Sequence, residues 1–278
     1  MLFLTLAILS SAMVSIVMRV SSHRISGNLT MLAVNYLICS VLGAGYAKFS
    51  LWQPQMDGFF LMVALGILAG ILYLAGFVML QRSVRKNGVV LSSVFMKLGL
   101  LVPIVLSLLL FHEIPTGAQI AGFLIAIGAI VVINMKQEAG REQFGMGLIL
   151  LLLLGGGCDA MSKIYEVYGN AALSEQFLFY TFLVAFVLCA VLVVRSRERF
   201  GWKELLFGTL IGVPNFFSAK FLLLALTSLP AVVVYPSFSV ATLLIITLTG
   251  AVVFKERLSR RQWAALAAIV AALILLNI

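Results

Sequence analysis

The sequence predicts an all-α membrane protein with ten transmembrane helices arranged as two inverted five-helix repeats. Three observations predict this fold class: the composition, a succession of long apolar segments, and a repeat that ends each half. Of the 278 residues, 63% are hydrophobic and only 10% are charged, whereas soluble domains carry roughly 25% charged residues. Because so few charges cannot cover a surface in water, the composition argues against a disordered chain and against a water-soluble enzyme.

Apolar segments follow one another along the whole chain, each close to the roughly 20 residues that a helix needs to cross a bilayer. The first has no basic region before it and no small-residue cleavage site after it, so we expect a retained helix and not a removed signal peptide. The expected boundaries of the ten segments are 1–18, 30–47, 58–81, 88–110, 116–135, 145–167, 176–194, 204–227, 232–253 and 262–277.

The 19 lysine and arginine residues predict the orientation of these helices. They concentrate in the loops after the first, third, fifth, seventh and ninth helices, whereas the other loops together hold only Lys48. Since basic loops remain in the cytoplasm, we expect these odd-numbered loops to be cytoplasmic and both termini to be outside, in the plasma or inner membrane of the cell. The same placement accounts for the net charge of +9 without a nucleic-acid partner. The basic residues of the odd-numbered loops are Arg19, Arg24, Arg82, Arg85, Lys86, Lys136, Arg141, Arg195, Arg197, Arg199, Lys203, Lys255, Arg257, Arg260 and Arg261.

A repeat at an offset of 143 residues divides the chain into two halves, because residues 111–134 recur at 254–277. Each half then holds five helices, an odd number, so the halves must enter the bilayer in opposite senses. Inverted repeats are a transporter architecture, with the substrate bound near the midplane between the halves. The expected organisation is a first repeat at 1–135, a cytoplasmic linker at 136–144 and a second repeat at 145–278.

Both halves end in an acidic turn followed by a helix, of the form Glu-x-[Pro/Leu]-[Thr/Ser]-x-x-Gln, which begins at Glu113 and again at Glu256. With these two turns and ten expected helices, the whole chain resembles the drug/metabolite transporter superfamily, specifically its EamA type. The resemblance implies a carrier of metabolites that works by alternating access, with a central cavity formed chiefly by helices 1, 3, 4, 6, 8 and 9. The resemblance gives almost no information about the substrate. Well-known members place both ends in the cytoplasm, the reverse of what the charges predict here.

The repeated turn itself is expected to be structural. Thr116 with Gln119, and Ser259 with Gln262, have the spacing of a capping box, in which two side chains satisfy the amides at a helix start. The acidic residue of each turn lies just before the cap, close to the membrane interface, so a direct ligand or proton role is the lesser interpretation.

No motif for catalysis or metal binding accompanies these features. Cys39, Cys158 and Cys189 fall inside apolar segments, and no cysteine or histidine cluster has metal-ligand spacing. His23 and His112 lie in or beside loops. Neither a Ser/His/Asp set nor a glycine-rich phosphate loop is present, so we expect no enzyme activity, no metal and no cofactor.

Five charged residues inside the apolar segments are the main functional clue, because each costs several kcal/mol in a bilayer unless it is paired or hydrated. Asp159, Lys163 and Glu166 share one helical face, which favours either an internal ion pair or a role in substrate and proton handling. Lys97 and Lys220 have no acidic residue within a turn. They are expected either to pair with Asp159 or Glu166 across the bundle, or to line the site of a substrate carboxylate or phosphate.

The leading hypothesis is a secondary-active transporter of a small polar metabolite that bears a carboxylate or phosphate. The alternatives are a broad exporter of amphipathic drugs or cations, a lipid-linked sugar flippase, and a membrane scaffold that transports nothing. The expected partners are the bilayer and a small-molecule substrate, and both a monomer and a homodimer stay open. The expected substrate-binding residues are Lys97, Lys163, Lys220, Ser93, Phe216, Tyr235 and Ser239, and the expected proton-coupling residues are Asp159 and Glu166.

Overall fold

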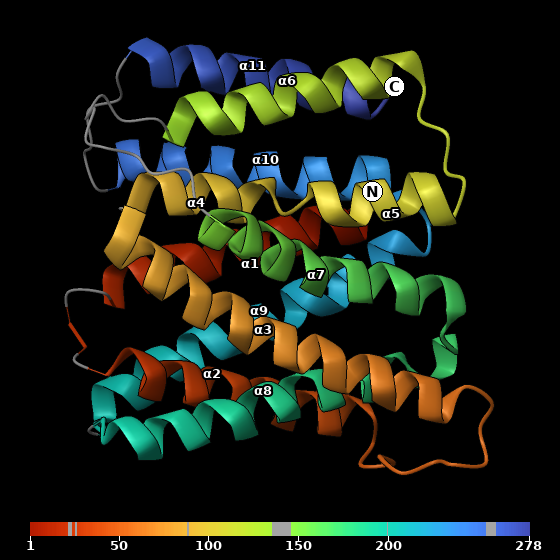
Figure 1. Cartoon of the computed structure of the whole chain (residues 1–278), viewed down its shortest axis with the longest axis vertical. Coiled ribbons are helices and arrows are strands. Elements are labelled where there is room, and N and C mark those ends of the chain that lie inside the picture. The colour runs from red at the N-terminus through yellow and green to blue at the C-terminus, as the bar shows by residue number, and fades with distance from the viewer. Residues whose placement is uncertain (22–23, 26, 88, 135–145, 199, 254–259) are drawn as a thin grey trace. The chain divides into compact units, whose positions relative to one another are not determined.

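A computed structural model describes the chain apart from residues 22–23, 26, 88, 135–145, 199 and 254–259, and the described part contains helices and no strands (Figure 1). The basic linker at 136–144, the second capping box at Ser259 and the acidic residue Glu256 lie outside the described residues. The helices are α1 (Leu2–Ser21), α2 (Asn28–Tyr46), α3 (Phe59–Asn87), α4 (Val89–Leu98), α5 (Leu101–Leu110), α6 (Gly117–Asn134), α7 (Met146–Tyr168), the 3₁₀ turn η1 (Ala171–Leu173), α8 (Ser174–Ser196), α9 (Trp202–Leu226), α10 (Ala231–Val252) and α11 (Arg260–Leu276).

Seven helices of the described part are long and apolar enough to cross a bilayer: α1, α2, α3, α7, α8 extended by η1, α9 and α10. The segments Phe95–Leu110 and Gly117–Val132 are shorter apolar helices. Large apolar side chains lie on the surface, among them Leu124, which is 61% exposed, and Val191, which is 59% exposed. Such a surface suits lipid and not water, so the predicted all-α, multi-pass membrane fold is confirmed.

Several helices extend by a few residues beyond the expected apolar segments. The third helix does not end at residue 81, because α3 continues to Asn87 and therefore carries Arg82 and Lys86, which were expected in a loop. The extension is rich in arginine and lysine, which are good helix formers, and contains neither glycine nor proline. The eighth segment begins at Trp202 instead of residue 204, so Lys203 also lies on a helix.

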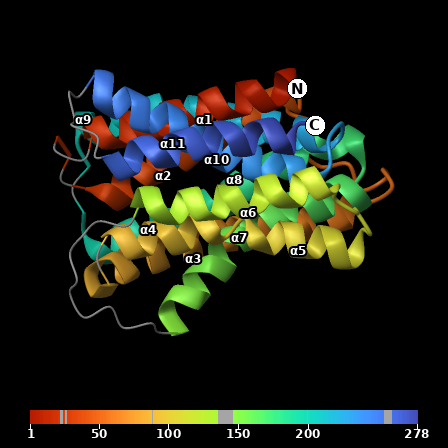
Figure 2. The same ribbon diagram turned by 90° about the horizontal axis from the view of Figure 1, so that it is seen from above.

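The expected single helix at 88–110 is broken in two. The turn at Gly99 and Leu100 separates α4 from α5, and α5 continues in roughly the same direction beyond it (Figures 1 and 2). Pro103 lies three residues into the second helix, where it has no N–H to donate to the carbonyl of Gly99 and its ring crowds that carbonyl. Glycine at this point further weakens the helix by about 1 kcal/mol relative to alanine. The two short helices and the turn between them still cover 22 residues, or about 33 Å at the rise of a helix, which is enough to cross the bilayer.

The helices form two compact units, each of which contains parts of both sequence halves. Unit 1 comprises residues 1–74 and 161–227, and unit 2 comprises residues 75–160 and 228–278. The helices α3 and α7 begin in one unit and end in the other. Within unit 1, α2 packs on α8 and on α9, and α1 packs on α9; within unit 2, α6 packs on α11.

Helices that correspond to each other in the repeat pack together within a unit. In unit 1, α2 and α8 lie side by side (Figure 1). Tyr36 stacks on Phe182 with ring centroids 6.4 Å apart, and near the other end of α2 a Cβ on Gly43 would lie 3.0 Å from the Cα of Phe179. Thr30 at the start of α2 donates to Glu198 beyond the end of α8, so the two helices run antiparallel. In unit 2, the backbone of α6 at Gly122 closely approaches that of α11.

Candidate functional site

The charged residues that the sequence places inside apolar segments fall into two clusters. Lys97 and Asp159 belong to unit 2, whereas Lys163, Glu166 and Lys220 belong to unit 1. The boundary between the units therefore falls between Asp159 and the residues Lys163 and Glu166, which share its helical face, because α7 passes from unit 2 to unit 1 directly after Ala160.

The unit 2 cluster lies at the break between α4 and α5. Lys97 occupies the last turn of α4, and its carbonyl accepts a 3.4 Å hydrogen bond from the N–H of Leu100, which closes the turn. The unpaired carbonyls of a helix C-terminus carry partial negative charge, which stabilises a cation nearby. The break in the helix therefore places a half-buried lysine at the C-terminal end of α4.

Close backbone contact brings α7 against this break. A Cβ on Gly99 would lie 2.8 Å from the backbone nitrogen of Gly156, and a Cβ on Gly156 would overlap the Gly99 carbonyl oxygen and lie 2.7 Å from Val102. Only glycine allows both approaches. The space that Gly155 and Gly156 leave on α7 holds α4 and α5, since Gly155 faces Met96 and Gly156 faces Val102.

Asp159, one turn beyond Gly156 on α7, is the electrostatic partner of Lys97. Its side chain is half-buried. Its backbone carbonyl accepts a 2.7 Å hydrogen bond from the hydroxyl of Tyr235 on α10. The Gly99–Gly156 approach therefore brings α7, which carries Asp159, against the break that ends α4 at Lys97, and Tyr235 adds a contact from α10.

Tyr235 belongs to a stripe of polar residues on α10. Tyr235 is 1% exposed and Thr242 is 1% exposed, while Ser239, between them on the same face, is half-buried. The Thr242 hydroxyl is buried and has no hydrogen-bond partner among the described residues. An unsatisfied buried hydroxyl costs roughly 1–3 kcal/mol, so Thr242 is the neutral residue of the stripe most in need of a partner. The backbone of Ser93 belongs to α4, and its side chain lies outside the described ones.

In unit 1, Lys220 on α9 forms an ion pair that the sequence did not predict. Its Nζ lies 2.7 Å from Oε1 of Glu175 and 3.5 Å from the centroid of the Tyr46 ring. Glu175 stands at the start of α8, where the helix dipole favours a carboxylate. The side chains of Lys220 and Glu175 are 15% and 24% exposed. A carboxylate and an aromatic face together therefore hold the ammonium.

Aromatic rings surround this ion pair. Phe216, which the sequence placed in the candidate site, is fully buried and packs on Tyr46 with ring centroids 5.6 Å apart. Phe217 contacts Tyr46 edge-on at 5.9 Å and stacks on Phe221 at 5.6 Å. Phe216 therefore supports the ring that faces Lys220, whereas the half-buried Phe217 lies at the surface of α9.

Lys163 and Glu166 form a second ion pair in unit 1, with Nζ and Oε2 2.7 Å apart. The lysine side chain is 4% exposed and the glutamate side chain is 18% exposed. Nearby on α7, Tyr165 stacks on Phe177 of α8 with ring centroids 4.2 Å apart and donates a 2.6 Å hydrogen bond to the carbonyl of Asn170. The pair thus lies where α7 is fixed to α8.

Sequence reasoning missed a further polar contact across unit 1. Asn215, beside Pro214 on α9, donates a 3.1 Å hydrogen bond to Oδ1 of Asn35 on α2, and Asn35 is 2% exposed. The thiol of Cys39 donates to the carbonyl of Gly212 at 3.3 Å. Pro214 does not interrupt α9, and these contacts satisfy polar groups around it. An asparagine inside an apolar segment was the available signal for Asn35.

The repeated acidic turn has a structural role in the first half. Thr116 and Gln119 form the predicted capping box, with reciprocal hydrogen bonds of 3.0 and 3.2 Å. Glu113 accepts a 2.8 Å hydrogen bond from the N–H of Ala231, the first residue of α10, and another from the hydroxyl of Ser107. The carboxylate therefore caps the helix that carries Tyr235, Ser239 and Thr242.

The cysteines and acids show no metal-like grouping in the part of the chain that the structure covers, since no three His, Cys, Asp or Glu residues come together there. Cys39, Cys158 and Cys189 are free and buried thiols. They lie in α2, α7 and α8.

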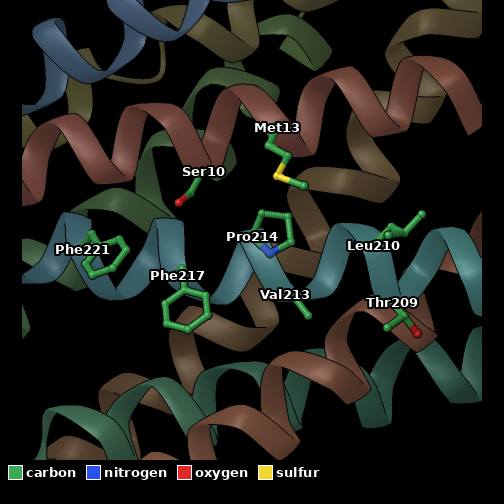
Figure 3. Close-up of a pocket in the computed structure, with 8 residues that line it drawn as sticks. All are labelled: Ser10, Met13, Thr209, Leu210, Val213, Pro214, Phe217 and Phe221. Atoms are coloured by element: carbon green, nitrogen blue, oxygen red, sulfur yellow. The ribbon is translucent and has the colours of Figure 1, made fainter.

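An apolar groove of 510 Å³ runs between α1 and α9 within unit 1 (Figure 3). The groove separates Ser10 and Met13 from a strip of α9, as the close-up shows. Phe217 and Phe221, which stack on each other, form one end of it. The lining residues are Ser10, Met13, Thr209, Leu210, Val213, Pro214, Phe217 and Phe221.

Comparison with known proteins gives consistent results over the whole chain. The model of the EamA-like transporter family matches residues 1–135 and, a second time, residues 145–278. An uncharacterized protein of Haemophilus influenzae is 25% identical over 273 residues, which make up 94% of this chain and 92% of that protein. A crystal structure with 18% sequence identity covers 99% of this chain and 94% of its own, with a TM-score of 0.72, and so shares the fold.

Proposed function

Because this chain belongs to the EamA-like transporter family, we propose that it is a secondary-active transporter of a small polar metabolite bearing a carboxylate or phosphate. Lys97 binds the anionic group, and Asp159 exchanges a proton during the cycle. The Lys97–Asp159 cluster at the α4–α5 break is the single observation that carries this proposal. Interrupted helices form the substrate and ion sites of many secondary transporters, since exposed backbone groups at the break can bind charge.

The residues around Lys97 suit a small anion. A lysine is a compact, strongly hydrated charge with three donors, and the α10 hydroxyls of Ser239 and Thr242 offer neutral donors in the same unit. Lys97 already has a carboxylate, that of Asp159, as its electrostatic partner. A substrate carboxylate would therefore replace the carboxylate of Asp159 as the partner of Lys97.

Alternating access of two inverted halves is the proposed mechanism. The antiparallel packing of α2 on α8, which correspond in the repeat, supports it, because inversion of one half reverses the direction of its helices. The two sequence halves at 1–135 and 145–278 would then be duplicated units, as the double match of the family supports.

A binding screen tests the substrate class. We would screen the purified full-length protein by thermal shift against a library of carboxylates, phosphates, sugars and amphipathic cations. Anionic metabolites should raise the melting temperature, and Lys97→Gln should weaken their binding at least 10-fold. Lys48→Gln, a matched change in an exposed turn, should leave binding unchanged. Anion binding that survives both Lys97→Gln and Lys220→Gln would exclude an anionic site built on these lysines.

The orientation is proposed from the loop charges: both termini outside, and the odd-numbered loops inside, in the cell membrane. Single cysteines introduced at Ser50 and at Ser196, which are both exposed, should react with an impermeant maleimide on intact cells only at Ser50. For this purpose the three buried cysteines are replaced by serine or alanine. Labelling at Ser196 and not at Ser50 would invert the proposed orientation.

A second candidate, an exporter of amphipathic cations, is favoured by one observation. Glu175 and the Tyr46 ring already bind an ammonium, that of Lys220, and a cationic drug needs the same two partners. If this candidate holds, Lys220→Gln should strengthen the binding of a quaternary ammonium probe, and Glu175→Gln should abolish it. Under the leading proposal neither variant binds the probe.

A further inference from the structure

We propose that the groove between α1 and α9 binds one acyl chain of a phospholipid whose phosphate group lies at Lys203. This inference is independent of the proposed transport function, because none of the charged residues of the candidate site lines the groove. All the lining residues belong to unit 1.

The groove has the length of one leaflet. Its lining on α9 runs from Thr209 to Phe221, which corresponds to about 18 Å of helix. Half of a hydrocarbon core of about 30 Å is about 15 Å. Met13, Leu210 and Val213 are 50%, 42% and 39% exposed, so the groove is open along its side and a chain can enter from the bilayer.

The lining excludes a polar occupant. Apart from the hydroxyls of Ser10 and Thr209, the lining side chains are hydrocarbon or thioether. The Thr209 hydroxyl already donates a 2.9 Å hydrogen bond to the carbonyl of Leu205. A small polar metabolite would find almost nothing to replace its hydration there, whereas an acyl chain needs no polar partner. The short side chain of Ser10 leaves the space that the chain fills (Figure 3).

A headgroup site lies on the same face of α9, beyond the Thr209 end of the groove. Lys203 precedes Leu210 by seven residues, or two turns, and is exposed. Leu206, which is 41% exposed, lies between Lys203 and the groove on the same face of α9. Trp202 is 69% exposed, and tryptophan is a residue type enriched at the level of the lipid headgroups.

The acidic residues at this end do not oppose a phosphate at Lys203. Glu204 is 5% exposed and accepts a hydrogen bond from the N–H of Gly27 at 3.4 Å. Glu198 accepts one from the N–H of Thr30 at 3.1 Å. Both carboxylates are thus directed at the start of α2 and away from the exposed face of α9, so neither of them neutralises Lys203.

Native mass spectrometry of the full-length protein in detergent tests this inference, with dioleoyl phosphatidylglycerol as the probe. We expect one bound lipid per chain. Ser10→Phe, which places a ring in the groove, should weaken binding at least 5-fold. Leu9→Phe is the matched control, since Leu9 is 52% exposed and does not line the groove; it should bind lipid as the unaltered protein does. Val213→Phe, at an exposed position of α9, repeats the test in case Ser10→Phe impairs folding.

The headgroup is tested with Lys203→Gln and with dioleoylglycerol, which has the same chains and no phosphate. Lys203→Gln should weaken phosphatidylglycerol binding at least 3-fold and leave dioleoylglycerol binding unchanged. Equal lipid affinity in Ser10→Phe, Val213→Phe and the unaltered protein would overturn the acyl-chain site. An effect of Lys203→Gln on both probes, or on neither, would overturn the phosphate assignment. If the spectra show a dimer of this protein, and Ser10→Phe converts it to a monomer, the groove is a dimer contact and the lipid site is refuted.

Discussion

The ion pair between Lys220 and Glu175 should couple the stability of α9 to that of α8. The Nζ–Oε1 distance of 2.7 Å gives an attraction of about 6 kcal/mol at an effective dielectric constant of 20, which is an upper figure because desolvation opposes it. Because its side chains are 15% and 24% exposed, this pair is intermediate between an exposed and a fully buried ion pair, and its energy should be intermediate as well. Exposed pairs contribute roughly 0.2–1 kcal/mol, and removal of one partner from a fully buried pair costs roughly 3–5 kcal/mol. We therefore expect a coupling energy of about 2 kcal/mol.

A double-mutant cycle measures this coupling. Glu175→Gln, Lys220→Gln and the double variant are unfolded in mixed micelles of increasing denaturing detergent, and their free energies of unfolding are compared. Each single variant leaves its partner a residual contact, since Lys220 keeps the Tyr46 ring and Glu175 keeps the N-terminus of α8. The single losses should therefore stay below those of a fully buried pair. The control cycle pairs Glu175→Gln with Lys203→Gln, about 25 Å farther along α9, and should show no coupling beyond about 0.5 kcal/mol. A coupling below this value for Glu175 and Lys220 would refute the reasoning.

Three further outcomes are expected. Gly156→Ala should destabilise the protein by about 1–3 kcal/mol in the same unfolding assay, because its Cβ would overlap the Gly99 carbonyl; Gly128→Ala, where nothing lies within 4 Å, should be neutral or stabilising by up to about 1 kcal/mol. Glu113→Ala should cost about 1–2 kcal/mol through loss of the cap on α10, and an unchanged midpoint would show that water replaces the cap. Asp159→Asn should retain substrate exchange in proteoliposomes and lose accumulation driven by a pH gradient; accumulation at the unaltered rate would exclude Asp159 from proton coupling.

The apolar segments predicted the helices well because bilayer thickness, and not tertiary packing, sets their length. The capping box at Thr116 and Gln119 was equally local: its two partners stand three residues apart, so the sequence alone specifies the contact. The break at Gly99 had a visible signal as well, a proline four residues after a glycine. Apolar content alone did not reveal it, because both short helices are as apolar as one long helix.

The partners of the buried charges were harder to predict. Glu175 lies one residue before the expected seventh segment and was therefore assigned to a loop, although it pairs with Lys220 on another helix. Lys163 pairs with Glu166, three residues along α7, and Asp159 interacts with Lys97. Helical spacing allowed Lys163 to pair with either acid, and the structure pairs it with Glu166 while Asp159 interacts with Lys97. This choice depends on packing between distant segments, which periodicity does not encode.

Charge balance links the proposed anion site to the proposed proton site. With Lys97 and Asp159 both ionised, the cluster is neutral, and a monoanionic substrate at Lys97 would leave it with one uncompensated negative charge. An uncompensated charge at this depth costs several kcal/mol, and a proton on Asp159 would remove it. Substrate and proton would then bind together and cross together, so that the loaded and the empty cluster are both neutral. Under the proposed function, Asp159 would therefore make the energy of the loaded site depend on the proton gradient.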